Sequence, residues 1–227
     1  MAAYPSVSAP YGLKPINLIG GQVFAGATRQ LAITTSAINY NTPIFNGDVV
    51  TLTSDGVVEV SPLAADVSPL AGVVGVFLGC SYTNPATKQK VFQQYWPGYA
   101  SGVTDAIAYV ADDPDQLFKA VNVAGTTSDN TSSGLLPAFV GLTAIGNNCR
   151  LVLNTGSTTT GDSKTGIYIA GATSSLPFRV VDVVPDTANS SGNFCELIVK
   201  FNAPNVTGQV CSTFAVVSAA LSRSFCM

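Results

Sequence analysis

The sequence has no histidine and few charged side chains. Its 227 residues include 10 Lys and Arg and 13 Asp and Glu, so only 10% of the chain is charged, whereas an average soluble domain is about 25% charged. The lack of histidine excludes Ser-His and Cys-His catalysis and any His-ligated metal site. Because few charges cover the surface, we expect partner subunits to bury part of it.

Long apolar runs and basic clusters are also missing. The longest apolar stretch, residues 71–80, is half of the roughly 20 residues that a membrane-spanning helix needs. The net charge is −3, and the closest basic pair is Lys88 and Lys90, whereas nucleic-acid binding usually requires a basic face. We therefore expect neither a membrane nor nucleic acid as a direct partner.

The cysteines form neither a zinc motif nor a secreted disulfide framework. They are odd in number and widely spaced, without a Cys-x-x-Cys pair. The five are Cys80, Cys149, Cys195, Cys211 and Cys226. This pattern predicts free thiols in a chain made in a reducing cytoplasm, and we expect no metal or other cofactor.

The sequence is rich in short β-prone runs separated by Gly, Ser, Thr and Asn. Ser54-Asp55-Gly56 between two such runs indicates a hairpin, since Gly accepts a positive φ. The predicted strands are 48–53, 57–60, 73–80, 91–95, 106–111, 138–142, 150–154, 165–170, 178–184 and 195–201. They predict a mainly β fold, an antiparallel β-barrel or sandwich. Asp112-Asp113-Pro114 predicts one helical turn over 115–118.

We divide the chain into three parts. Residues 1–21 are expected to form an extended N-terminal arm, because prolines recur at positions 5, 10 and 15. Residues 22–202 form the β domain, for which a division into two subdomains near 122–137 stays open. Residues 203–227 are apolar and small, and are interpreted as a C-terminal docking tail that could be a strand or a short helix. No internal repeat is apparent in the sequence.

The remaining candidates for chemistry have simpler structural explanations. The acidic group Asp112, Asp113 and Asp115 could pair as acid and base or hold Ca²⁺, but it fits a helix cap better. Adjacent Ser163 and Lys164 are typical of a solvated loop rather than of a catalytic dyad. Trp96 fits packing in a core or an interface. We therefore predict that the chain is not an enzyme.

Several segments together resemble a family of virion structural proteins of tailed bacteriophages, of the marine and cyanophage type. Their order and spacing span about residues 9–202, and residues 46–78 are similar to the β-barrel part of head-decoration proteins. The motifs are Ala-Pro-Tyr-Gly-Leu-Lys-Pro (9–15), Gly-Val-Phe-Leu-Gly-Cys (75–80), Tyr-Trp-Pro (95–97), Tyr-Val-Ala-Asp-Asp-Pro (109–114), Gly-Ser-Thr-Thr-Thr-Gly (156–161), Leu-Pro-Phe-Arg-Val-Val (176–181) and Ile-Val-Lys-Phe-Asn (198–202).

The resemblance implies a capsid decoration, or cement, protein. Such a protein is made in the cytoplasm of the bacterial host, lies on the capsid surface of the virion and staples the shell of major capsid protein, commonly as a homotrimer. It has no catalytic residues. Large residues of the arm, the tail and the β domain are the candidate contact residues: Tyr4, Pro10, Tyr11, Leu13, Trp96, Phe214 and Phe225. The tail 203–227 and the polar insert near 122–137 depart from the family pattern.

Three alternatives stay open. A tail or receptor-binding β protein of the same virion would share the β composition, but it should carry a stalk or an aromatic sugar-binding groove. A major capsid protein needs a long spine helix, for which we find no pattern. A cytosolic β-sandwich enzyme or sugar-binding module is disfavoured because the sequence lacks the chemistry.

Overall fold

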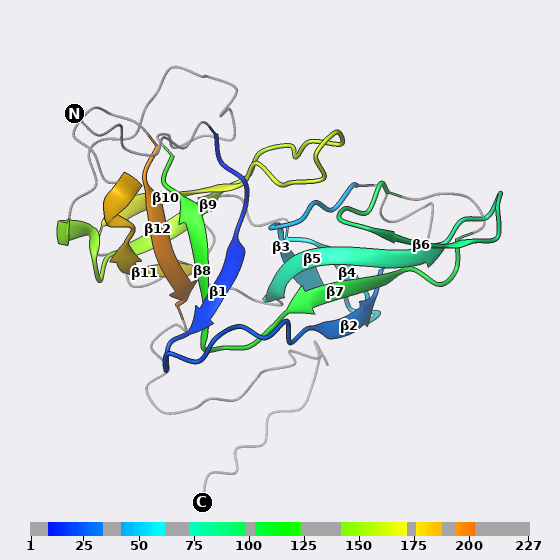
Figure 1. Ribbon diagram of the computed structural model, residues 1–227, viewed down its shortest axis with the longest axis horizontal. Coiled ribbons are helices and arrows are strands. Elements are labelled where there is room, and N and C mark those ends of the chain that lie inside the picture. The colour runs from blue at the N-terminus through cyan, green and yellow to red at the C-terminus, as the bar shows by residue number, and fades with distance from the viewer. Residues whose placement is uncertain are drawn as a thin grey trace, which may run out of the picture.

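The computed structural model shows a mainly β protein built from two six-stranded antiparallel sheets (Figure 1). In the part of the chain that the structure describes, the only helical segments are two single 3₁₀ turns. The described residues are 9–33, 42–61, 73–98, 103–123, 142–171, 176–187 and 194–202. The predicted mainly β, antiparallel class is thus confirmed.

The strands and turns follow one another in short segments. Their bounds are β1 Lys14–Leu18, β2 Arg29–Ala32, β3 Val49–Leu52, β4 Val58–Val60, β5 Val73–Thr83, β6 Lys90–Gln93, β7 Ile107–Ala111, β8 Gln116–Val121, η1 Leu142–Ala144, β9 Asn148–Val152, β10 Gly166–Gly171, β11 Phe178–Val183, η2 Pro185–Thr187 and β12 Glu196–Phe201.

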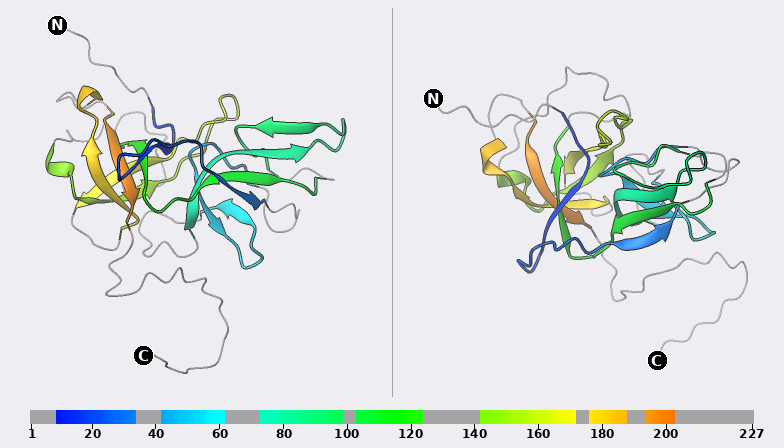
Figure 2. Two further views of the ribbon diagram at one scale, coloured as in Figure 1. Left: turned by 60° about the horizontal axis from the view of Figure 1, so that its bottom comes forward. Right: turned by 45° about the vertical axis from the view of Figure 1, so that its right-hand side comes forward.

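Each sheet is built mostly from one half of the chain. The first sheet has the order β2-β7-β5-β3-β4, and β6 pairs with the outer half of β5 to form a projecting hairpin. The second sheet has the order β1-β8-β12-β11-β9-β10. β1 is the exception, because it pairs with β8 although it precedes the first sheet in the sequence. Figure 2 shows β1 lying along the second sheet before the chain crosses to β2.

One expectation is corrected at the connection between the sheets, and another falls mostly outside the described residues. Asp112-Asp113-Pro114 does not start a helix: Gln116–Val121 is strand β8, and the Asp113 carboxylate accepts the N–H of Asp115 at 2.8 Å in a tight turn. β8 buries Gln116 and Phe118 alternately, and this period of two belongs to a strand. The strand expected at 138–142 lies outside the described residues except for Leu142, which begins η1.

The two halves share one topology, although the sequence shows no repeat. In each half we number five strands from 1 to 5 along the chain: β2, β3, β4, β5 and β7 in the first half, and β8 to β12 in the second. Across both sheets the strands then lie in the same spatial order, 1-5-4-2-3. We call residues 29–111 the first unit and residues 116–201 the second unit. Corresponding pairs of neighbouring strands are antiparallel in both units. The chain is therefore a structural tandem.

The register of the strands is the same in the two units. In the ladder between the fourth and fifth strands, each unit carries one extra residue on the fourth strand, Leu78 in β5 and Val181 in β11. The position of this bulge matches in the two ladders, because Phe77 pairs with Val110 just before it, as Val180 pairs with Val199. A bulge at one register position is a specific feature rather than a by-product of sheet formation.

Each unit also curls towards closure at the same place. A single parallel bridge joins Ile33, directly after the first strand, to Val58 in the third, and an equivalent bridge joins Asn122 to Ile167. These are isolated bridges, so among the described residues neither sheet is a closed barrel. The barrel part of the predicted fold class is corrected to two open, curled sheets.

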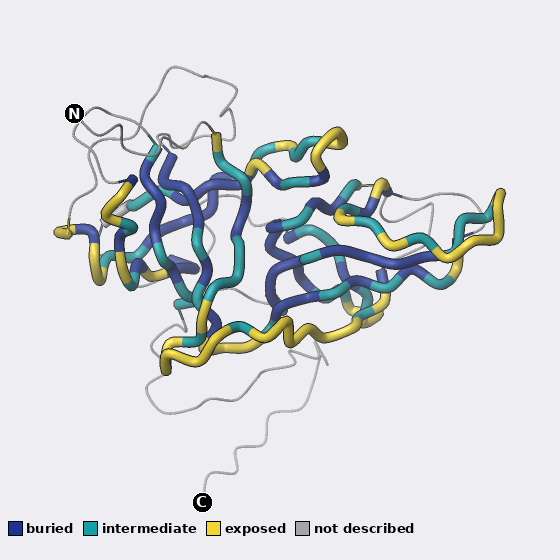
Figure 3. The backbone as a smooth tube through the Cα atoms, viewed as in Figure 1, coloured by how far each residue is buried: buried dark blue, intermediate teal, exposed yellow. Residues whose placement is uncertain are grey.

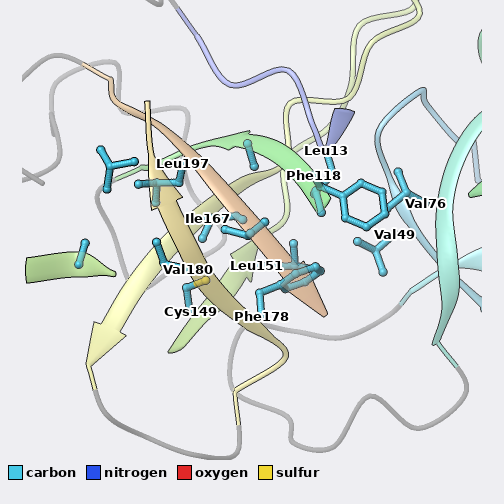
Figure 4. Close-up of a cluster of buried hydrophobic side chains, with 14 of the residues drawn as sticks. Leu13, Val49, Val76, Phe118, Cys149, Leu151, Ile167, Phe178, Val180 and Leu197 are labelled. Atoms are coloured by element: carbon cyan, nitrogen blue, oxygen red, sulfur yellow. The ribbon is translucent and has the colours of Figure 1, made fainter. Parts of the chain in front are cut away.

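The curled sheets enclose the two hydrophobic cores, which appear as buried stretches in Figure 3 and, for the second unit, as the cluster in Figure 4. Structurally equivalent positions point into both cores and are almost fully buried. The equivalent pairs are Val50 and Cys149, Val58 and Ile167, Phe77 and Val180, Ala108 and Leu197, and Val110 and Val199. Burial of these β-branched and aliphatic side chains supplies most of the driving force for folding.

The extended arm expected over residues 1–21 is described only from residue 9. There Lys14–Leu18 form strand β1, and the chain returns along its outer edge, where Asn17 bridges Val23. Residues 203–227 lie outside the described residues. The change from one unit to the next occurs at the turn between Ala111 and Gln116, upstream of the 122–137 region considered from the sequence.

Candidate interaction surfaces

The described residues contain no group of three or more Cys, Asp or Glu side chains that could hold a metal ion. The acidic trio is used locally: Asp112 forms an ion pair of 2.7 Å with Arg29, and Asp113 closes its own turn. These contacts give Asp112 and Asp113 structural roles.

Ser163 does not pair with Lys164. Its hydroxyl is buried and donates a hydrogen bond of 2.5 Å to the Asp48 carboxylate, while Lys164 is exposed. Asp48 also accepts the Thr165 hydroxyl at 3.3 Å and the Phe45 N–H at 2.8 Å. Burial raises the pKa of Asp48, and these three donors oppose the shift only in part. The group ties the two units together.

A second polar cluster lies beside this contact. The Lys14 ammonium donates to Asn46 at 2.6 Å and pairs with Asp162 at 2.7 Å, and Gln94 donates to the same Asp162 oxygen at 2.9 Å. Asn46 in turn donates to the Leu78 carbonyl at 2.8 Å. The cluster joins β1, the first unit and the 154–165 loop, so it fixes the junction rather than a ligand.

Two glycines bring the backbones together at this junction. Gly12 and Gly47 have φ values of 79° and 95°, and the Leu13 N–H donates to the Gly47 carbonyl at 3.0 Å. A Cβ on Gly47 would lie 2.9 Å from the Leu13 nitrogen, so a larger residue does not fit.

An open hollow with a cavity volume of about 370 Å³ borders the junction. Among the described residues that line it, Asp48 is the only ionisable one, alongside Phe45, Val60, Asn154 and Thr165. Both oxygens of this carboxylate already accept hydrogen bonds from within the protein, from the Phe45 N–H and the Ser163 hydroxyl.

The described contact residues predicted for the arm, Pro10, Tyr11 and Leu13, lie against the protein itself. Pro10 is half-buried, and the Tyr11 hydroxyl donates to Glu196 at 2.5 Å, which together with burial raises the pKa of Tyr11. Lys119 pairs with the same carboxylate at 3.1 Å and lies 5.7 Å from the centre of the Tyr11 ring. Leu13 is fully buried against the second core.

Trp96 is fully buried in the first core and makes an edge contact with Tyr82, with ring centres 5.2 Å apart. A partner cannot touch Trp96 or Leu13 in this conformation, so neither belongs to an exposed surface. The other predicted contact residues, Tyr4, Phe214 and Phe225, lie outside the described residues.

Among the described residues, five large apolar side chains that the sequence did not point to are exposed. Ile19 and Val23 lie at the hairpin after β1, Phe92 on β6, and Leu142 and Ile145 at η1. Val23, Phe92 and Leu142 are the most exposed, at 76%, 71% and 77%. For Phe92 a signal existed: it alternates with Val91 in a strand, so one of the two must face outward.

Within the described ranges, no helix is long and apolar enough to cross a membrane. Comparisons with protein-family models, curated proteins and solved structures found no match to this chain.

Proposed function

We propose that this chain is a structural, non-enzymatic virion protein that decorates the shell of major capsid protein in a tailed bacteriophage. The observation that carries the proposal is the distribution of exposed apolar side chains. They stand on three separate elements, the hairpin after β1, strand β6 and η1. Each of these side chains would gain free energy if a partner removed its apolar surface from water.

Separate contact points suit a protein that binds several neighbours at once. A staple gains affinity from simultaneous weak contacts, because each further contact is made at high effective concentration. A small-molecule enzyme would need one concave pocket with converging polar groups, and the hollow near Asp48 has one carboxylate, held by internal donors. The low charge of the chain, 10%, agrees with a surface that is covered in an assembly.

The two linked units support the same role. Two β units joined by buried hydrogen bonds can present contact points from both units to neighbouring subunits at once. We further propose that the protein self-associates as a homotrimer on the shell. Light scattering of the purified protein should then give a multiple of 23.3 kDa.

Binding to empty shells of the cognate major capsid protein tests this function. Val23→Ser, Phe92→Ser and Leu142→Ser each remove one exposed apolar side chain. Exposed substitutions alter the unfolding free energy by only about 0.5 kcal/mol. We expect wild-type protein to cosediment with shells, and at least one variant to bind about tenfold more weakly, equivalent to about 1.4 kcal/mol.

Thr87→Ser is the matched control, because Thr87 is exposed on the same β5–β6 hairpin as Phe92 but is polar. It should bind like wild type. Wild-type protein that stays in the supernatant at micromolar concentration would contradict the decoration role. Wild-type binding that none of the three variants weakens would instead show that another surface makes the contact.

A further inference from the structure

The first unit has an open strand edge where the second unit has a filled one. In the second unit, β1 lies along the outer edge of β8, with Lys14 opposite Lys119 and Pro15 opposite Phe118. The equivalent strand of the first unit is β2, whose outer edge meets Val58 of β4 at its far end, through the Ile33 bridge, and pairs with no other described residue.

The backbone of β2 offers hydrogen-bonding groups at this edge. Ile33 donates its N–H to Ala106, on the β7 side. Since N–H groups alternate along an antiparallel strand, those of Gln30 and Ala32 point away from β7. Both residues are exposed. An unpaired strand edge of this kind is a template for another strand.

Side-chain burial indicates that the first unit is incomplete here. By register, Arg29 and Leu31 are equivalent to Phe118 and Ala120. Phe118 and Ala120 are fully buried, whereas Arg29 is exposed and Leu31 is only partly buried. β1 lies beside β8, where it covers this end of the second core, so a strand beside β2 would cover Leu31 in the same way.

We propose that the segment 209–217 of this chain, from the same or a neighbouring subunit, binds the outer edge of β2 as an added strand. The segment reads Gln-Val-Cys-Ser-Thr-Phe-Ala-Val-Val, with neither charge, Pro nor Gly. β-branched and aromatic residues suit a strand, and both Pro and Gly would weaken it. The proposal does not depend on the capsid role.

The end of the second unit lies close enough for this segment to reach. Lys200, at the end of β12, pairs with Leu117 at the start of β8. The turn just before β8 holds Asp112, which contacts Arg29 at the start of β2 through the 2.7 Å ion pair. From Asn202 to position 209 an extended chain spans up to about 25 Å, which gives the segment room to reach the edge of β2.

Disulfide trapping in the full-length chain tests the proposal. In a Cys211→Ser, Cys226→Ser background, Gln30→Cys is combined with one new cysteine at each position from 209 to 217 in turn. A disulfide needs Cα atoms about 4.4–6.8 Å apart. We expect crosslinks at alternating positions, because successive side chains of a strand point to opposite faces, formed about tenfold faster than in the control.

The control uses Thr87→Cys in place of Gln30→Cys. Thr87 is also exposed, but it lies in the β5–β6 turn. On non-reducing gels, a crosslinked monomer identifies the tail of the same chain and a dimer identifies that of a neighbour; both support the proposal. The proposal is overturned if no crosslinks form, if the crosslinked positions do not alternate along the segment, or if the crosslinks form no faster than in the control. A dimer formed by Gln30→Cys alone, without a tail cysteine, also overturns it, because β2 would then pair with β2 of a second copy.

Discussion

The hydroxyl of Ser163 donates a 2.5 Å hydrogen bond to the carboxylate of Asp48, across 115 positions of sequence. The two residues belong to different units, and both are buried. This contact makes the junction between the units sensitive to the ionisation of a single carboxyl group.

We expect stability to fall as the pH rises through the raised pKa of Asp48. In the unfolded chain this carboxyl ionises near its ordinary value of 3.8, but in the folded protein burial holds the proton to higher pH. The contribution of Asp48 to the unfolding free energy is thus complete below the pKa of this carboxyl in the unfolded chain. It is lost as the pH rises through the pKa of the same carboxyl in the folded protein. Urea unfolding followed by fluorescence of the single Trp96 should show that, as the pH rises from below 3.8 towards neutrality, the unfolding free energy falls less in Asp48→Asn than in wild type.

Asp55→Asn is the control for removing a charge, because Asp55 lies exposed in the β3–β4 turn. Its pH profile should match that of the wild type. If the unfolding free energies of wild type and Asp48→Asn changed with pH in parallel, the pKa of Asp48 would not be raised in the folded protein.

Gly47→Ala should destabilise the protein much more than Gly21→Ala. Both glycines have positive φ, 95° and 80°, and an added Cβ costs about 1–2 kcal/mol in this region. Only at Gly47 would the Cβ also meet the Leu13 backbone at 2.9 Å, whereas at Gly21 no atom lies within 4 Å. We expect an additional loss of about 1–3 kcal/mol for Gly47→Ala, measured by denaturant midpoints. Equal losses would contradict the close approach of β1 to the first unit.

Cys80, Cys149 and Cys195 should be unreactive in the native protein. All three are free and buried, and burial raises the pKa of Cys80 to about 12 and raises that of Cys149 as well. Because the thiolate is the reactive form, a Cys211→Ser, Cys226→Ser variant should show no rapidly titrating thiol at pH 8. The same variant should show three in denaturant. One fast thiol in the native state would show that a core opens.

Removing residues 2–8 should leave the fold intact and weaken shell binding. The deletion stops before Tyr11, whose hydroxyl donates to Glu196, and before Leu13, which packs in the second core. We expect an unchanged unfolding midpoint and a tenfold loss of shell affinity, about 1.4 kcal/mol. Deleting 2–13 instead should lower stability by about 3 kcal/mol or more, since it removes the buried Leu13. Tight decoration by the 2–8 deletion would show that this arm is not a staple.

The sequence predicted those strands whose composition marks them. The Ser54-Asp55-Gly56 turn does join β3 to β4, with Gly56 at φ 75°, and the Val-rich run at 73 begins β5. β1 and β2 were missed, because Lys-Pro-Ile-Asn-Leu and Arg-Gln-Leu-Ala contain little β-branched character. These strands form through pairing with β8 and β7, which composition does not reveal.

The repeat was missed for a related reason. Equivalent core positions hold different residues, such as Phe77 and Val180, so the similarity lies in register and bulge position rather than in identity. The polar junction was equally hidden, because nothing in the sequence relates Asp48 to Ser163. Exposure of Val23 and Leu142 likewise depends on where the chain turns.

The pairing of β1 with β8 has a consequence for how the chain acquires its structure. Lys14 is translated early, but its partner Lys119 follows only after the whole first unit. Contacts this distant in sequence carry a large loop-closure cost and slow folding. The amino-terminal strand can therefore take its place in the second sheet only after β8 has been synthesised. Once in place it spans both units, so they should melt in one cooperative transition rather than in two.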